Sequence, residues 1–166
     1  VKIIHIHPHG LTATIRGVKV DLYDWKVPFL NEPIRADGLR IASMEDVFAY
    51  KCEAILDRKA EKDFIDVTEI LSVKPLNELL KGFQMRYPHY YKSAVLAILL
   101  KPESFTRDHT IQYLNGLSWE EYCSRMKQAI IEYEKNIEGL KEEKMKLREE
   151  NIQNLIEQKK RKKDQK

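Results

Sequence analysis

The first 25 residues alternate between apolar and polar side chains with the two-residue period of β-strands. Turn residues, Pro8 to Gly10 and then Gly17, divide this part of the chain into three short segments. These segments span residues 1–7, 11–16 and 18–25. The pattern predicts a strand followed by a hairpin, which together form an antiparallel meander.

From Ser43 onward, apolar residues recur at the 3.6-residue spacing of helices. The predicted helices span residues 43–60, 63–72, 75–87 and 90–100, and a longer one begins at Ser118. The fourth is almost wholly apolar, so we expect it in the core. The fifth opens with a capping box formed by Ser118 and Glu121. Residues 26–42, which contain two prolines and a glycine, are expected to form a connector.

Strands followed by helices indicate an α+β fold. We expect a short antiparallel β-meander, then a helical bundle and a long C-terminal helix. The corresponding parts are 1–42 (meander and connector), 43–134 (helical domain) and 135–166 (a charged helical extension). At 166 residues, with 43% hydrophobic residues, the chain is long enough to bury a core.

The extension departs from a regular heptad pattern. Its apolar core positions are Ile137, Leu140, Leu147 and Leu155, and polar residues take the places between them at Lys144, Asn151 and Asn154. These interruptions argue against an oligomerisation module. The basic run 159–163 is either a solvated end, which we favour, or an electrostatic handle for RNA.

A lysine interrupts the apolar stripe of the first predicted helix. The stripe consists of Met44, Val47, Phe48 and Ile55. Lys51 falls in the middle of it. Burying an ammonium group without a partner is costly, so we expect a negative charge nearby.

Two carboxylates follow Lys51, at twelve and fifteen residues. Asp63 and Asp66 are three residues apart at the start of the second helix, displaced from its apolar stripe. A hairpin of the two helices brings Lys51 towards both. Two alternatives assign no function: Asp63 caps the second helix with Asp66 in its first turn, or Lys51 extends its ammonium group out of a shallow interface.

Charge and cysteine content change this picture little. The net charge is +3, but residues 135–166 carry eleven Lys/Arg against seven Asp/Glu, so the basic excess lies in the extension. Cys52 and Cys123 lack metal or disulfide spacing and indicate reduced, buried thiols in a cytoplasmic protein. The longest apolar run, 94–100, is too short to span a membrane, and no signal peptide is recognisable.

The segment from Ile41 to Leu71 resembles the AbiEii/AbiGii-type nucleotidyltransferase toxin family. The shared pattern is Ser43, then Glu45-Asp46, a helical Lys51, Arg58 seven residues later, and the run Lys62-Asp63-Phe64-Ile65-Asp66. The resemblance covers roughly residues 11 to 134. It implies an enzyme of a bacterial toxin–antitoxin or phage-defence system that transfers NMP from an NTP to an RNA, with tRNA a plausible target, or to a protein. A cognate antitoxin is an implied partner.

The resemblance also gives a role to Asp21. This residue lies between Val20 and Leu22, and polymerase-β-type nucleotidyltransferases place a third carboxylate in such a hydrophobic-Asp-hydrophobic strand. By resemblance, Asp21 is the carboxylate next to Mg²⁺, or the base. Lys51 neutralises the triphosphate of the NTP, and Asp63 or Asp66 orients Lys51 or the acceptor. Without the resemblance, Asp21 is better explained as a solvent-facing residue of a half-exposed sheet.

One part of the family pattern is not present. No segment of the chain matches the Gly-Ser loop or the Asp-x-Asp pair of these enzymes, which precede the hairpin in the family and would therefore lie upstream of Val1. We expect the chain by itself to be inactive and unable to hold two metal ions. The alternative function, in another class, is a non-catalytic, degenerate transferase scaffold that binds RNA or a protein partner.

Three histidines and a group of tyrosines are further candidates. His5, His7 and His9 alternate along the first strand, without a cysteine or carboxylate close in sequence to complete a zinc site, so we favour exposed polar positions. The tyrosines are Tyr87, Tyr90 and Tyr91. Aromatic side chains of this kind can stack on nucleic-acid bases. Packing at a helix–helix corner is the commoner use of such residues, and we favour it here.

Overall fold

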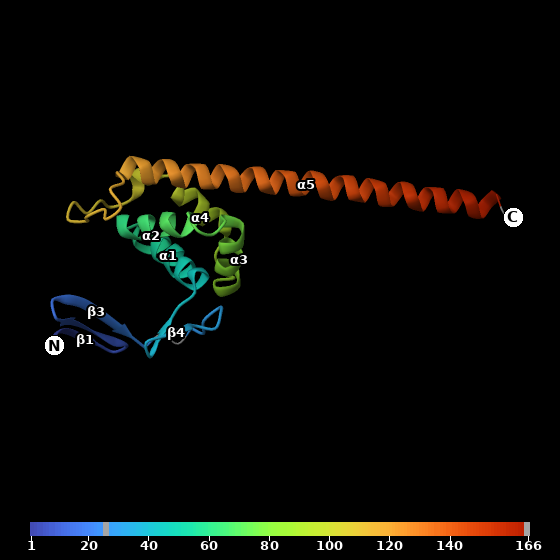
Figure 1. Cartoon of the computed structure of the whole chain (residues 1–166). Coiled ribbons are helices and arrows are strands. Elements are labelled where there is room, and N and C mark those ends of the chain that lie inside the picture. Colours follow the sequence, from blue (N-terminus) through green and yellow to red (C-terminus); the bar gives the residue numbers. More distant parts are fainter. Residues whose placement is uncertain (25–26, 165–166) are drawn as a thin grey trace.

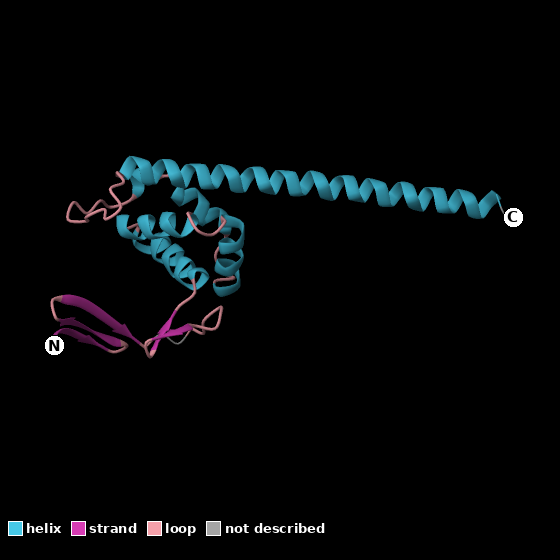
Figure 2. Ribbon diagram, in the orientation of Figure 1, coloured by secondary structure: helices cyan, strands magenta, loops and turns pink. Residues whose placement is uncertain are grey.

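The computed structural model describes residues 1–24 and 27–164, with side chains up to Gln153. The fold is α+β, as predicted, with a three-stranded antiparallel meander, a small second sheet and five α-helices (Figures 1 and 2). The strands are β1 (Lys2–His7), β2 (Gly10–Ile15), β3 (Val18–Tyr23), β4 (Ile34–Ala36) and β5 (Leu39–Ile41). The helices are α1 (Met44–Arg58), α2 (Glu61–Leu71), α3 (Leu76–Arg86), α4 (Lys92–Leu99) and α5 (Trp119–Asp164), with a 3₁₀ turn at Pro102–Ser104.

The meander has one apolar and one polar face. In the register of its strands, Leu11 lies opposite Leu22, and Thr12 lies opposite Asp21. The apolar face is formed by Ile3, Ile6, Leu11, Ala13, Ile15, Val18, Val20 and Leu22. Of these, Ala13 is buried, whereas Ile6 is 68% exposed. Such an exposed apolar sheet face is typical of an interaction surface.

The connector contains a hairpin that the sequence interpretation overlooked. Ile34–Ala36 pairs with Leu39–Ile41 around a tight turn. Asp37 and Gly38 both have positive φ angles, 50° and 78°, as a type I′ turn requires. The Asp-Gly dipeptide is a known signal for this turn, but strands of three residues are too short for an alternating pattern to be recognised.

The hydrophobic core lies between the helices. It is built around the fully buried side chains Phe48, Ile55, Phe64, Leu79, Leu80, Phe83, Val95, Leu99, Met126 and Ile130. The first half of α5 closes one side of it. The expectation that the fourth helix lies in the core is confirmed: α4 buries Val95 and Leu99, whereas the residue that follows it, Leu100, is 46% exposed.

Capping explains where two of the helices begin. The side chain of Ser43 accepts a hydrogen bond from the backbone N–H of Asp46 and starts α1. In α5, Ser118 accepts from the N–H of Glu121 while the Glu121 carboxylate accepts from the N–H of Ser118, which confirms the capping box. Among the helices that the structure describes, none is both long and apolar enough to cross a lipid bilayer.

Candidate functional site

Lys51 on α1 meets two carboxylates of α2. Its Nζ lies 3.1 Å from Oδ1 of Asp63 and also forms an ion pair with Asp66. The Lys51 side chain is 26% exposed, Asp63 is fully buried and Asp66 is 47% exposed. The predicted convergence of these three side chains is confirmed. The alternative in which Lys51 extends away from them is wrong.

A sharp turn between the two helices brings these groups together. Lys59 ends α1 in the left-handed conformation, with a φ of 47°, and Ala60 precedes α2 in an extended conformation. Ala60 also pairs with Thr106, which fixes the turn to the segment before α5. Ala60, and not Asp63, is therefore the N-cap of α2. Asp63 points back at α1 from the first turn of α2.

Arg58 holds the same buried carboxylate. Its Nε lies 2.8 Å from Oδ2 of Asp63, and its Nη2 lies 3.0 Å from Oδ1, so the guanidinium group binds the carboxylate with two parallel hydrogen bonds. The sequence interpretation noted Arg58 in the family pattern but did not assign it to the site. A signal was available, because Arg58 lies seven residues after Lys51, on the same side of α1.

The electrostatics of the cluster favour the charged forms of Asp63 and Lys51. Burial of Asp63 disfavours its charged form, but the hydrogen bonds and charges of Arg58 and Lys51 outweigh this and hold the pKa of Asp63 below its usual value. Burial likewise disfavours the charged form of Lys51, but Asp66 and Asp63 outweigh it and raise the pKa of Lys51. Two cations and two carboxylates therefore form a charge-balanced group whose outer members, Arg58 and Asp66, are half-exposed.

Asp21 lies on the polar face of the meander, with other partners. Its Oδ1 accepts a hydrogen bond from the hydroxyl of Thr12 at 2.6 Å, and its Oδ2 lies 3.6 Å from Nζ of Lys19. The hydrogen bond from Thr12, the charge on Lys19 and the more distant charge on Lys62 lower the pKa of Asp21. Lys62 belongs to α2, so the polar face and the start of α2 influence each other. Within the described contacts, Asp21 does not join Lys51, Asp63 or Asp66.

The described residues do not form a metal centre. No group of three or more His, Cys, Asp or Glu side chains converges among them. The ring centroids of His5 and His7 lie 5.8 Å apart, and His7 lies 4.9 Å from the ring of Tyr23. Asp21 offers one carboxylate, whereas Mg²⁺ is usually held by one or two carboxylates together with substrate phosphates and water. Asp21 therefore supplies one ligand, and the described residues do not complete a magnesium site.

A second buried ion pair was not anticipated from the sequence. Asp46 and Arg86, at 0% and 1% exposure, form an ion pair between α1 and α3. Asp46 also accepts hydrogen bonds from the hydroxyl of Ser43 and from the backbone N–H of Leu30, and Arg86 donates to the carbonyl of Pro28. This network fastens the connector to the helical domain, so we assign it a structural role.

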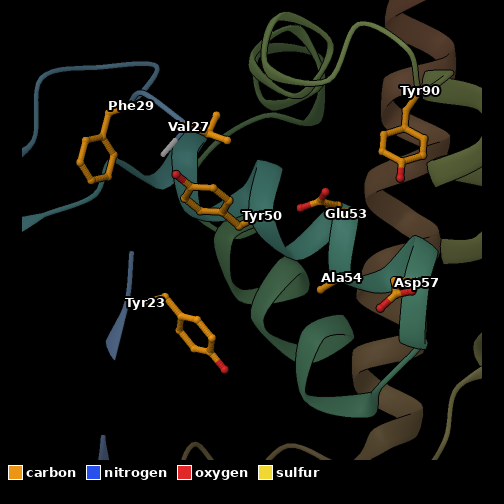
Figure 3. A pocket seen from close by; sticks show the side chains of 8 residues that line it. All are labelled: Tyr23, Val27, Phe29, Tyr50, Glu53, Ala54, Asp57 and Tyr90. Carbon is orange, nitrogen blue, oxygen red and sulfur yellow. The ribbon is translucent and has the colours of Figure 1, made fainter. Parts of the chain in front are cut away.

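A pocket of about 630 Å³ opens between β3 and α1. Figure 3 shows its lining, which consists of Tyr23, Val27, Phe29, Tyr50, Glu53, Ala54, Asp57 and Tyr90. Aromatic rings and two carboxylates suit an aromatic or basic part of a ligand better than a phosphate. Ala54 lies three residues after Lys51 and four before Arg58, so the pocket adjoins the ion cluster on α1.

The structure does not describe the side chains of the basic run 159–163, nor those of Asn154 and Leu155, so the role of the run in binding RNA stays a prediction.

Tyr90 packs against the core, with its ring 6.2 Å from that of Phe83, whereas Tyr91 is 78% exposed. Packing at a helix corner therefore accounts for Tyr90 and does not account for Tyr91.

Comparison with known proteins gives one distant relative. The chain is similar to an uncharacterized protein of Aquifex aeolicus, with 25% identity over 135 residues. The aligned part covers 76% of this chain and 62% of the relative, so the chain spans less than two thirds of that protein. No family model matches the chain. No solved structure matches it either.

Proposed function

We propose that this chain belongs to a nucleotidyltransferase-like protein of a bacterial toxin–antitoxin or phage-defence system. The observation that carries the proposal is the position of Lys51. Its ammonium group is held in a fixed place by a fully buried carboxylate, and 26% of its side chain stays exposed. Lys51 lies three residues before Ala54, which lines the pocket. A structural ion pair does not require this partial exposure, whereas a group that contacts a ligand does.

The exposure of each side chain supports a different role for it within the proposal. Asp63, which is buried and bound by both cations, orients them. Lys51 and the half-exposed Arg58 supply positive charge for the triphosphate of an NTP, because such transfer depends on charge neutralisation around the phosphates. Asp66 is 47% exposed and faces the acceptor. The adjoining pocket, with its tyrosines, accommodates the base of the nucleotide.

The reaction in this proposal transfers NMP to a hydroxyl of an RNA, with tRNA a candidate, or of a protein. The acceptor oxygen forms a bond to the α-phosphate and loses its proton, and the bond from the α-phosphate to pyrophosphate breaks. Mg²⁺ would assist such a transfer, with Asp21 as one ligand, but the residues described here do not complete its site, so we derive no step through it. A cytoplasmic location and a cognate antitoxin belong to the same proposal.

The exposed apolar face of the meander supports this assignment. Eight apolar residues form it, and most of them are accessible to solvent. Within the proposal, this face receives the segment that carries the Gly-Ser loop and the Asp-x-Asp pair. The pairing of Asp21 with Thr12 on the opposite face leaves its carboxylate accessible, with 39% of the side chain exposed.

A labelling assay tests the proposal. This chain, joined to the segment with the Gly-Ser loop and the Asp-x-Asp pair that the resemblance implies, is incubated with labelled NTPs, Mg²⁺ and total RNA, alongside Lys51→Ala and Asp21→Ala. We expect each variant to lose label by about 10²–10³-fold, as is usual when a group that stabilises transition-state charge is removed. Lys81→Ala is the matched control, because Lys81 is an exposed lysine on α3. Equal labelling by all four proteins would reject the site.

A non-catalytic scaffold that binds RNA or a protein is the second candidate. The observation that favours it is the lack of converging metal ligands among the described residues. It predicts no labelling by any of the proteins, together with RNA retention on a filter that falls with salt concentration. The same preparations therefore separate the two candidate functions.

A further inference from the structure

The outer half of α5 extends beyond the helical domain. Within the described part of the chain, Tyr133 is the last residue of α5 that packs against the core, and Asn136 is the last that lines a groove with α2 and α3. Every residue from Glu138 to Gln153 is exposed. Figure 1 shows this half of the helix running away from the domain. A helix that stands alone in water is marginally stable, so this segment gains from a partner.

The face of α5 that packs on the domain continues along the outer half. It is formed by Met126, Ile130, Tyr133, Ile137, Leu140, Lys144, Leu147 and Asn151, at alternating spacings of four and three residues. This alternation is the heptad spacing of a coiled coil. Met126 and Ile130 are buried in the core, whereas Leu140 and Leu147 are 49% and 57% exposed. The second half of the stripe is therefore an uncovered continuation of a face that is buried in the first half.

The residue types on this stripe fit two parallel strands. In the heptad notation a to g, Ile137, Lys144 and Asn151 occupy a, and Leu140 and Leu147 occupy d. Ile at a with Leu at d favours two strands, and an Asn or Lys at a single a position specifies register and number of strands at some loss of stability. Two of the three a positions are polar here, so we expect a weak pair. From the sequence alone these polar residues argued against an oligomerisation module. On the exposed outer half of α5 they fall at a positions, where a parallel dimer tolerates them at some loss of stability.

The flanking charges fix the direction of the partner. Lys141 and Arg148 occupy e, and Glu143 and Glu150 occupy g. In a parallel pair, Glu143 meets Arg148 of the second copy, which is an attractive contact. In an antiparallel pair, e positions meet e positions and g positions meet g positions, so Lys141 would face Arg148 and Glu143 would face Glu150. These flanking pairs favour a second copy in the parallel orientation, and the repulsion between the two Lys144 side chains, which face each other at a, weakens it.

We propose that residues 133–153 of α5 form a parallel two-stranded coiled coil with the same segment of a second copy of this chain. This dimer places both helical domains at one end, so each site keeps its own Lys51 cluster. The proposal is independent of the nucleotidyltransferase assignment, because it depends only on α5.

Sedimentation equilibrium tests the dimer. Over about 10 to 300 μM, a range that includes the weak association expected of a seam of three heptads, the full chain is expected to approach twice its monomer mass. Leu147→Glu places a charge in the seam and is expected to give a monomer at all these concentrations. Met145→Glu is the matched control, because Met145 is a 63% exposed apolar residue of the same helix that lies outside the seam. A monomeric unmodified chain, or equal loss of association in both variants, would overturn the proposal.

Cross-linking tests the orientation. Asn151→Cys places two thiols face to face only in the parallel register, and oxidation is expected to give a covalent dimer. The baseline is the unmodified chain, whose Cys52 is buried and whose Cys123 is half-buried. Gln153→Cys, at an outward position, is expected to remain monomeric on a denaturing gel. Failure of Asn151→Cys to cross-link to itself, or its cross-linking only to a Leu140→Cys chain, would rule out the parallel dimer. A heteromeric coiled coil with another protein would appear as a monomer in both experiments.

Discussion

The ammonium group of Lys51 on α1 lies 3.1 Å from the buried carboxylate of Asp63, which is twelve residues later in the chain and belongs to α2. Lys51 interrupts the apolar stripe of α1, and Asp63 lies beside the apolar stripe of α2. The contact exists because each group alone would be costly to bury. The same contact supports two roles, in stability and in function, and the variants below separate them.

Asp63 and Asp66 are expected to contribute unequally to stability. Asp63→Asn removes a fully buried charge that two cations contact, and both cations keep access to water, so we expect the free energy of unfolding to fall by about 1–3 kcal/mol. Asp66→Asn alters a half-exposed pair and is expected to cost about 0–1 kcal/mol. Urea denaturation measures both. Equal losses would contradict the assignment of Asp63 as the anchoring carboxylate.

Much of this cluster was predictable, because it follows from local rules. The helical period placed Lys51 inside an apolar stripe, and desolvation required a negative partner. Arg58 could have been assigned to the cluster from its place on the same side of α1 as Lys51. Its bidentate geometry could not be predicted, because it depends on the left-handed turn at Lys59, which no glycine or asparagine signals. The pairing of Asp46 with Arg86 spans forty positions between two helices, a separation that periodicity does not reach.

The position of the meander relative to the helices could not be predicted from the sequence either. Alternation predicted its three strands and the two faces, including the face that carries Asp21. It contains no information on how a sheet sits against a helical bundle. That arrangement leaves Asp21 with Thr12 and Lys19 as its described partners. The role of Asp21 therefore stays a prediction, and the variants of the labelling assay decide it.

Acid is expected to destabilise the helical domain. Asp63 is held ionised by Arg58 and Lys51 against its burial, and its pKa is lower in the folded chain than in the unfolded one. A carboxyl group of this kind stabilises the fold above its unfolded pKa of about 3.9, and this contribution is lost as the pH falls through the folded pKa. Thermal melting between about pH 7 and pH 2 should show a decline below about pH 5. Asp63→Asn should reduce the slope of that decline, and an unchanged slope would contradict the assigned pKa direction.

The ion pair of Arg86 with Asp46 is expected to contribute more to the free energy of unfolding than the pair of Lys74 with the adjacent Glu45. Arg86→Met leaves the fully buried Asp46 without its cation and should lower the free energy of unfolding by about 3–5 kcal/mol. Lys74→Met removes the partner of Glu45, and that pair is about one-third and one-fifth exposed, so the loss should be about 0–1 kcal/mol. Denaturation with urea compares the two variants. Similar losses would show that backbone N–H donors alone satisfy Asp46.

Asp21 is expected to titrate below an ordinary aspartate because Thr12 donates a hydrogen bond to it, with help from the charge on Lys19. Thr12→Val removes that donor and should raise the pKa of Asp21, as followed by the carboxyl carbon resonance in an NMR titration. Thr14→Val is the control, because Thr14 lies on the same face, opposite Lys19. An Asp21 pKa that does not respond to Thr12→Val would show that the hydrogen bond is not the main cause of the lowered pKa.

The direction of the Asp21 pKa shift also bears on the chemical role of this residue. A general base works best with a pKa near the working pH, whereas a metal ligand has to be ionised. The lowered pKa of Asp21 therefore disfavours the role of base within the proposed reaction.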